Sequence, residues 1–218
     1  MKILVINGSP RTNGLTASIL HSLESELVKL GNDVEYVDLV GLDMKHCLGC
    51  CSCYKTGRCV LNDDAEILSE KIRIADGLVI GSPTYASNVS GLMKDFIDRG
   101  HFVIEQLLTG KYCVTVATGE NYGCSAARKV LDDLVVYSGG ILCGHIAMKA
   151  PFNGKDAVSG KIAHISHRAA RRLNDKKRNI LLALFHSMIF RIGIRPFVMR
   201  KGELYKGVTE RWKLEGIL

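Results

Sequence analysis

Four cysteines fall within thirteen residues, in the pattern Cys47-x2-Cys50-x2-Cys53-x5-Cys59. Three thiolates at successive x2 spacings are typical of the run that wraps one side of an iron-sulfur cubane, whereas zinc sites usually separate two Cys pairs by a dozen or more residues. Gly57 can turn the chain back, so that Cys59 closes the same cluster. The spacing therefore favours a [4Fe-4S] cluster, with metal-free thiols and zinc as the alternatives.

The other four cysteines have simpler interpretations. Cys51 lies between two predicted ligands and is spare. Cys113, Cys124 and Cys143 lie in or beside apolar segments, where a cysteine usually serves as a small core residue. The chain opens on an apolar run with no basic leader or cleavage site before it, so we expect a cytoplasmic, reducing environment, in which close cysteines are more often ligands than disulfides.

A second chemical motif follows the first apolar run. Residues 8–16 read Gly-Ser-Pro-Arg-Thr-Asn-Gly-Leu-Thr and lead into a helical pattern. Unpaired N–H groups and the positive dipole end of a helix start favour a phosphate, although an ordinary capped turn is the alternative. The loop matches neither the nucleoside triphosphate motif nor the Gly-x-Gly-x-x-Gly fingerprint, so a mononucleotide is the expected ligand.

The alternation of predicted strands and helices along the chain indicates the fold that positions these motifs. Short apolar runs at 2–6, 34–39, 78–80, 112–117 and 141–148 predict strands, and the segments between them have helical spacing. The 218 residues and 47% hydrophobic content suit one α/β domain with an appendage. We therefore expect a five-stranded doubly wound parallel sheet, which binds ligands at the carboxyl ends of its strands.

Two more loops leave these predicted strand ends. Residues 82–90 and 117–123 combine small residues and backbone polar groups with one tyrosine each, Tyr85 and Tyr122. A tyrosine can stack on a planar ring, although each could equally be a surface aromatic. Together with the phosphate loop, the two segments describe a flavin pocket.

These residues resemble a known family. The phosphate loop, the segment Pro83-Thr-Tyr85 with residues 92–99, and the cysteine motif are similar to the NADPH-dependent FMN reductase superfamily, most of all to its iron-sulfur flavoproteins, over residues 1–150. The resemblance implies a flavodoxin-like fold over 1–175, with the cysteine loop at 47–59 and an extension at 176–218. It implies the cluster on Cys47, Cys50, Cys53 and Cys59.

The resemblance also implies the residues that hold FMN. The phosphate would lie on Ser9, Arg11, Asn13, Gly14, Leu15 and Thr16. The ring would lie against Pro83, Thr84, Tyr85, Ala86 and Asn88, with Thr118, Gly119, Glu120, Tyr122 and Gly123 closing the site. Homodimers or homotetramers are implied as well, in which the cluster of one subunit approaches the flavin of another.

We therefore expect a redox protein with no acid-base side chain. FMN and a cubane would carry electrons from a ferredoxin-like or NAD(P)H donor to an acceptor. A plain NAD(P)H-dependent FMN reductase of quinones, nitro compounds or a metabolite is the first alternative. A flavin-binding protein that docks on a membrane surface or a partner is the second.

The extension differs in character from the rest. Residues 161–218 hold 14 Lys/Arg against 4 Asp/Glu, which gives a formal charge of +10 against −3 for the residues before them. Residues 179–190 are almost wholly apolar, and twelve residues interrupted soon after by Arg191 and Arg195 are too short to span a bilayer. We favour burial against another subunit over membrane-surface contact through 176–201, and an acidic redox partner over nucleic acid.

Overall fold

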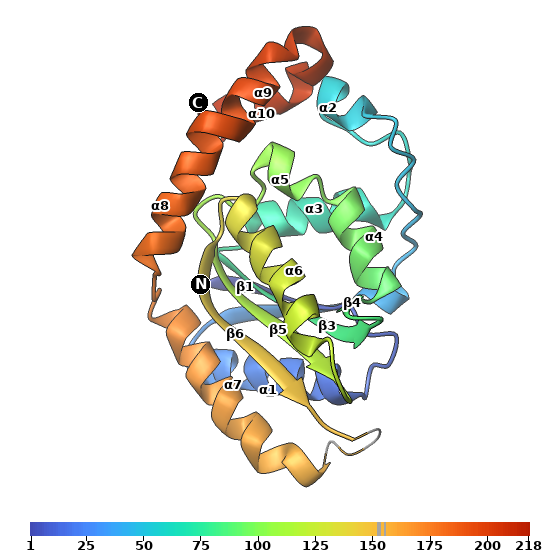
Figure 1. Ribbon diagram of the computed structural model, residues 1–218, viewed down its shortest axis with the longest axis vertical. Helices are drawn as coiled ribbons and strands as arrows, with labels where there is room; N and C mark the ends of the chain where they lie inside the picture. The colour runs from blue at the N-terminus through green and yellow to red at the C-terminus, as the bar shows by residue number, and fades with distance from the viewer. Residues whose placement is uncertain (152–153, 155) are drawn as a thin grey trace.

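The computed structural model describes residues 1–151, 154 and 156–218. Its centre is a parallel sheet in the order β2-β1-β3-β5-β6, the order of flavodoxin-like folds (Figure 1). The strands are β1 (Lys2–Asn7), β2 (Asp33–Asp38), β3 (Gly77–Tyr85), β5 (Tyr112–Gly119) and β6 (Ile141–Lys149). The five predicted strands and the doubly wound class are confirmed. The two-residue β4 (Asn88–Val89), antiparallel to the end of β3, was not predicted.

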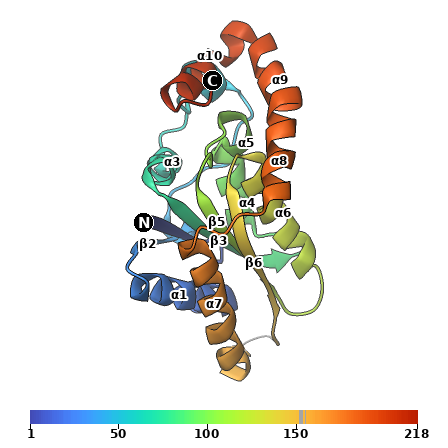
Figure 2. The ribbon, with the colours of Figure 1, turned by 90° about the vertical axis from the view of Figure 1, so that its left-hand side faces the viewer.

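Helices cover both faces of the sheet (Figures 1 and 2). One face carries α1 (Leu15–Lys29) and α7 (Ser159–Asn174). The other carries α3 (Asp64–Ile74), α4 (Gly91–Arg99), α5 (Phe102–Glu105) and α6 (Cys124–Tyr137). Short 3₁₀ turns follow β2 at Leu39–Gly41 and precede α7 at Asp156–Val158.

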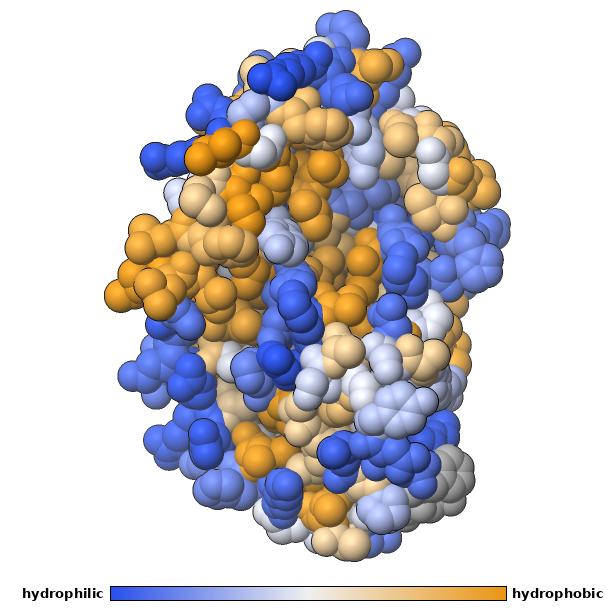
Figure 3. Space-filling model, in the orientation of Figure 1, coloured by the Kyte–Doolittle hydropathy of each residue, from blue (hydrophilic) through white to orange (hydrophobic). Residues whose placement is uncertain are grey.

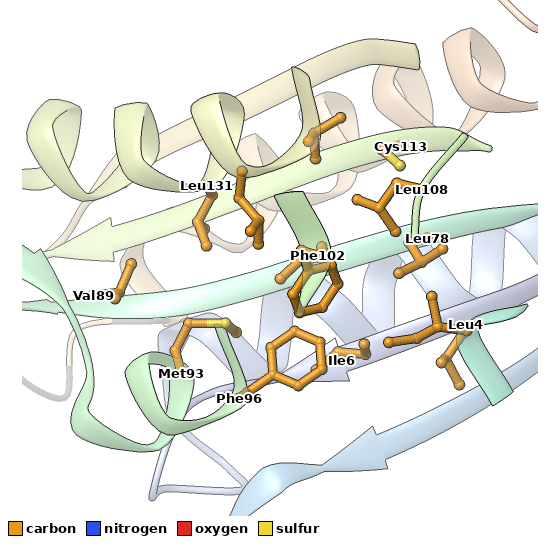
Figure 4. Close-up of a cluster of buried hydrophobic side chains, with 14 of the residues drawn as sticks. Leu4, Ile6, Leu78, Val89, Met93, Phe96, Phe102, Leu108, Cys113 and Leu131 are labelled. Atoms are coloured by element: carbon orange, nitrogen blue, oxygen red, sulfur yellow. The ribbon is translucent and has the colours of Figure 1, made fainter. Parts of the chain in front are cut away.

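The core lies where these helices meet the strands. The last five residues of β1 are buried, which explains its continuous apolar run. Under α4 to α6, Phe96 meets Phe102 edge to face with ring centroids 4.9 Å apart (Figure 4). Cys113, Cys124 and Cys143 are buried, as predicted. Burial of each large apolar side chain contributes about 1.5–3 kcal/mol, so this core holds the strand ends in place.

The third strand is longer than its apolar run indicated. β3 continues through the polar residues after 80 to Tyr85, and Pro83 still pairs with Thr118 of β5. Ser90 then caps α4 by accepting a hydrogen bond from Met93 N, and its Oγ donates to Gly8 O at 2.5 Å. These contacts fix the first and second ligand loops against each other.

The C-terminal extension begins with one long helix. α8 (Ile180–Ile189), a π-helical segment (Phe190–Ile194) and α9 (Arg195–Arg200) run continuously, and η4 (Gly202–Tyr205) and α10 (Lys206–Leu214) follow (Figure 2). The expectation of a twelve-residue segment too short for a membrane is wrong in its length, because the helix continues past Arg191 and Arg195. Within the described ranges, Ile180–Arg200 is one helix whose length and composition alone would allow a span.

Candidate functional site

A cavity of about 770 Å³ opens at the carboxyl ends of the strands. Ten of the predicted FMN residues line it, all from the three predicted loops: Arg11, Asn13, Gly14, Leu15, Pro83, Thr84, Tyr85, Thr118, Gly119 and Glu120. This volume is within the range of small-molecule and cofactor sites. The structure therefore brings together the loops that the sequence assigned to one ligand.

The phosphate end of this cavity is the start of α1. Gly14 is the N-cap, no side chain caps the helix, and no acidic residue lies in its first turn. The first-turn N–H groups and the positive dipole end are therefore available to an anion. The loop before them is ordered from within, because Asn7 Oδ1 accepts from Ser9 N at 3.0 Å and Ser9 Oγ accepts from Arg11 N at 3.1 Å.

The cavity also holds a polar group without a normal partner. Thr84 Oγ1 is buried and has no hydrogen bond of ordinary geometry within the part of the chain that the structure describes; its neighbour is the weakly bonding Cys124 thiol. A buried hydroxyl usually has a partner, so Thr84 offers a donor or acceptor to a ligand. The uncapped helix start, the cavity volume and this hydroxyl fit a flavin mononucleotide.

Six predicted residues do not line the cavity. Ser9 and Thr16 are buried beneath it, where Thr16 Oγ1 lies 2.6 Å from Thr118 Oγ1. Tyr122 is 77% exposed, so it does not stack over the cavity. Gly123 has a φ of +79°, and a Cβ there would come within 2.6 Å of Ser87 Cα. Its role is therefore to let the two ring loops approach each other closely at the rim. Ala86 and Asn88 also lie outside the lining.

The prediction missed a fourth loop. Ala150, Pro151 and Gly154, which follow β6, line the cavity, and so does Pro10 of the phosphate loop, which was not predicted as a site residue. The rule that ligands bind at the carboxyl ends of parallel strands applies to β6 as well, so the predicted strand at 141–148 already contained this signal. Positions 152, 153 and 155, in the same loop, lie outside the described residues.

The cysteine loop forms a second candidate site. Cys47, Cys50 and Cys51 are exposed and Cys53 and Cys59 are half-buried, all as free thiols. One short helix, α2 (Ser52–Thr56), lies in the loop. Within residues 1–151, 154 and 156–218, no three His, Cys, Asp or Glu side chains lie close enough together to hold a metal ion. The donor set suits a cubane in type and number, but the positions of the thiols do not form a closed ligand set.

A buried ion pair supports Cys59. The Arg99 and Asp63 side chains are 1% and 0% exposed and make two hydrogen bonds of 2.6 and 2.7 Å. Arg99 Nη2 also donates to Cys59 Sγ at 3.5 Å, and Nη1 donates to Lys45 O at 2.6 Å. Burial acts to raise the pKa of Asp63, but the bonds from Arg99 and two backbone N–H groups outweigh it, and the net pKa is below its usual value. Arg99 thus brings a fixed positive charge to one predicted ligand.

Cys53 has a different environment. Burial, and then the negative charge of Glu105, raise the pKa of its thiol to about 12. Glu105 is itself 2% exposed. Burial acts to raise its pKa, yet hydrogen bonds from His101 and Arg73 and the Arg73 charge lower it overall. Without a metal, Cys53 is therefore a neutral thiol at pH 7, and metal binding would release its proton.

The two candidate sites lie at opposite ends of α4. Ser90, before the first residue of α4, contacts the phosphate loop, whereas Arg99, its last residue, contacts Cys59. Nine residues at 1.5 Å each make this helix about 13 Å long. In Figure 1 α2 lies beside α10, away from the arrowheads of the strands. The motif follows β2 in sequence, but the loop carries it along α4 to the end that lies away from the phosphate loop.

Comparison with known proteins finds a flavin-binding family and relatives named as flavoproteins. Residues 1–155 match the family described as NADPH-dependent FMN reductase. An iron-sulfur flavoprotein of Clostridioides difficile is 38% identical over 225 residues, covering 100% of both chains. One from Archaeoglobus fulgidus is 43% identical over 99 residues, covering 45% of this chain and 48% of its own.

Solved structures agree on the fold. An NADH:FMN oxidoreductase in its apo form superposes with a TM-score of 0.59 at 19% identity, over 80% of this chain and 89% of its own. The sheet order and the loops around the cavity correspond to this flavodoxin-like architecture. The chain thus belongs to the NADPH-dependent FMN reductase family and is an FMN-dependent oxidoreductase or electron-transfer flavoprotein.

Proposed function

We propose that the protein is an iron-sulfur flavoprotein that transfers electrons between a ferredoxin-like or NAD(P)H donor and an acceptor through FMN and a [4Fe-4S] cluster. When bound, FMN exchanges electrons in pairs or singly, and a cubane exchanges them singly. The observation that carries the proposal is the presence in one chain of a flavin-sized cavity and a loop with five free thiols, four of them at cubane spacing and one of these four bonded to a buried arginine.

The chain's own residues have distinct tasks at the flavin. The first turn of α1, with Arg11 and Asn13, holds the phosphate by N–H groups and charge. Thr84 presents a hydroxyl to the polar side of the ring, and Pro83 and Tyr85 give it an apolar wall. Pro10, Ala150 and Pro151 shield it from water on the remaining side.

At the cysteine loop, Cys47, Cys50, Cys53 and Cys59 are the proposed ligands. Exposed Cys47 and Cys50 have room to move toward the half-buried pair Cys53 and Cys59. The N–H of Arg99 on Cys59 Sγ stabilises negative charge on that sulfur, and hydrogen bonds to sulfur are one of the factors that set the reduction potential of a cluster.

A matched pair of cysteines tests the ligand assignment. Cys50 and Cys51 are adjacent, exposed and free, and only Cys50 fits the spacing. We expect Cys50→Ser to lose iron and labile sulfide after anaerobic purification while keeping FMN, and Cys51→Ser to keep both cofactors. Equal iron content in the two variants would exclude the assignment.

A cluster-free NAD(P)H-dependent FMN reductase is the second candidate. The observation that favours it is the open arrangement of the thiols, which in the described residues form no closed ligand set. In that case NAD(P)H bleaches the flavin within seconds in protein that has never been exposed to oxygen and holds no iron. Iron and sulfide in such protein would exclude this alternative.

We also propose a homodimer or homotetramer formed through the long C-terminal helix. Its exposed large side chains include Ile180, Leu181, Leu184, Met188 and Ile192. Figure 3 shows a hydrophobic patch at the left, where α8 lies in Figure 1. Leu181→Glu with Leu184→Glu should yield monomers in light scattering, whereas the wild type is oligomeric. A monomeric wild type that sediments with anionic vesicles would indicate membrane-surface docking instead.

The cellular location and the electron donor of the protein are also proposed. We propose a cytoplasmic protein whose donor is acidic. A groove of about 350 Å³ between β6 and α7 is lined by Lys161, Arg168 and Arg172, and β6 leads directly to the flavin cavity. Charge reversal at Arg168 should slow reduction by ferredoxin and leave reduction by dithionite unchanged.

A further inference from the structure

The C-terminal helix α10 packs directly on the cysteine loop. A Cβ atom at Gly207 would lie 2.2 Å from the backbone nitrogen of Gly57, so the two backbones touch. Arg211 Nη2 donates to Gly57 O at 3.1 Å. Gly57 ends α2 in the left-handed conformation, with a φ of +75°, and lies between Cys53 and Cys59. The contact therefore acts on the turn that separates two predicted ligands.

Aromatic packing extends this contact. Tyr54, next to Cys53, stacks on Tyr205 with ring centroids 4.8 Å apart. Trp212 of α10 is fully buried and meets Phe190 edge to face at 5.2 Å. Burial raises the pKa of Tyr54, in keeping with its shielding from water. Residues 47–59 and the extension thus share a small hydrophobic core that is separate from the two cores of the sheet.

A buried charge network anchors the other side of α10. Glu105 Oε2 lies 2.6 Å from Arg73 Nη2 and 3.5 Å from Arg211 Nε. Arg73 also pairs with Glu215 at 2.7 Å, just after α10 ends. These ion pairs join α3 and α5 to α10, so α10 is held against the domain while it contacts the loop.

The loop has little order of its own. α2 has five residues, and its N-cap residue, Cys51, makes no side-chain capping bond. Helices this short do not persist in water without tertiary contacts. The elements that pack on α2 are η4 and α10, in the region of the chain farthest from it in sequence (Figure 1), and His101 adds an edge-to-face contact with Tyr54. The turn between Cys53 and Cys59 therefore depends on α10, while Arg99 holds Cys59 itself.

We propose that α10 is a clamp that positions the cysteine loop, with Gly207 and Arg211 as its positioning residues. The clamp fixes the turn between Cys53 and Cys59 and keeps both thiols half-buried, while Cys47 and Cys50 stay free to close on a bound cluster. The role of the loop as a cluster site rests on the proposed function, but the clamp itself is a property of the chain without metal.

The test is Gly207→Ala against Gly160→Ala in the full-length protein. Each glycine is the second residue of its helix, but a Cβ at Gly160 meets no atom of the described residues within 4 Å. Thiol modification is followed residue by residue by mass spectrometry in iron-free protein. In the wild type we expect fast reaction at Cys47, Cys50 and Cys51 and slow reaction at Cys53 and Cys59.

Gly207→Ala should accelerate the two slow thiols about tenfold, whereas Gly160→Ala should not. FMN content should be unchanged in both variants, and in iron-loaded protein only Gly207→Ala should alter the electron paramagnetic resonance signal of the reduced cluster. Unchanged rates at Cys53 and Cys59 would overturn the clamp.

Two outcomes need a further measurement or a separate interpretation. If Gly207→Ala fails to fold, Arg211→Gln, which removes the bond to Gly57 without steric conflict, is measured in the same way, with Arg211→Lys as the conservative variant that should restore slow reaction. If the wild type binds no iron, the proposed cluster fails, yet the thiol rates still decide whether α10 clamps the loop.

Discussion

The flavin cavity lies at the carboxyl ends of buried parallel strands, whereas the cysteine loop lies between α4 and α10 with one five-residue helix of its own. Each flavin loop is short and begins where a strand of the core ends, so the sheet fixes its position. The helix and turn at 52–57 in the cysteine loop are held by residues more than 140 positions away, such as Arg211 on Gly57, whereas Arg99 holds Cys59. Damage to α10 should therefore affect the thiols and spare the flavin.

The largest expected effect is at the buried ion pair. Arg99→Met leaves the Asp63 carboxylate buried without its cation, which should lower the free energy of unfolding by about 3–5 kcal/mol. Lys94→Met on the same helix removes the exposed pair with Asp98 and should cost less than about 1 kcal/mol. Urea unfolding followed by circular dichroism measures both, and equal losses would contradict the role of burial.

The next effect concerns the flavin phosphate. Arg11→Gln should weaken FMN binding by about 1.5–3 kcal/mol, because it removes a charged donor at the start of α1. Lys2→Gln, at the other end of β1, is the control and should leave the dissociation constant unchanged. Fluorescence quenching of FMN on titration gives both constants. The thiol rates at Cys53 and Cys59 should not respond to either change.

A smaller effect is expected at the ring. Thr84→Val removes the buried hydroxyl that has no normal partner in the described structure, so FMN binding should weaken by about 0.5–1.5 kcal/mol. The unfolding midpoint of the FMN-free protein should stay the same or rise slightly, since the hydroxyl loses no internal bond. A marked loss of stability without FMN would show that Thr84 serves the fold and not the ligand.

The smallest expected effect is the release of α10 on acidification. The pKa of Glu105 is lower in the folded protein than in the unfolded chain, where it is about 4.3. The carboxylate therefore stabilises α10 fully at a pH above the unfolded pKa, and this stabilisation is lost as the pH falls through the folded pKa. Trp212 fluorescence should therefore report release of α10 below about pH 4. Glu105→Gln should already release it partly at pH 7 and remove this acid step. An identical acid transition in that variant would point to another group.

The same comparison explains what the sequence could predict. Apolar runs such as residues 2–6 are local signals, and the rule for parallel sheets then assigns their carboxyl ends to the ligand, which is why ten residues of the cavity were predicted. The exposed position of Tyr122 and the contribution of Pro151 depend on how each loop folds back, which spacing does not encode. The contact of Gly207 with Gly57 joins two distant segments, and no periodicity predicts it.

The proposed function requires one chain to carry both FMN and a [4Fe-4S] cluster. Protein purified without exposure to oxygen should contain about four iron and four sulfide per FMN, with flavin bands above a broad sulfur-to-iron absorption. FMN at full occupancy with neither iron nor labile sulfide would contradict the claim and leave a flavin reductase whose loop thiols bind no cluster.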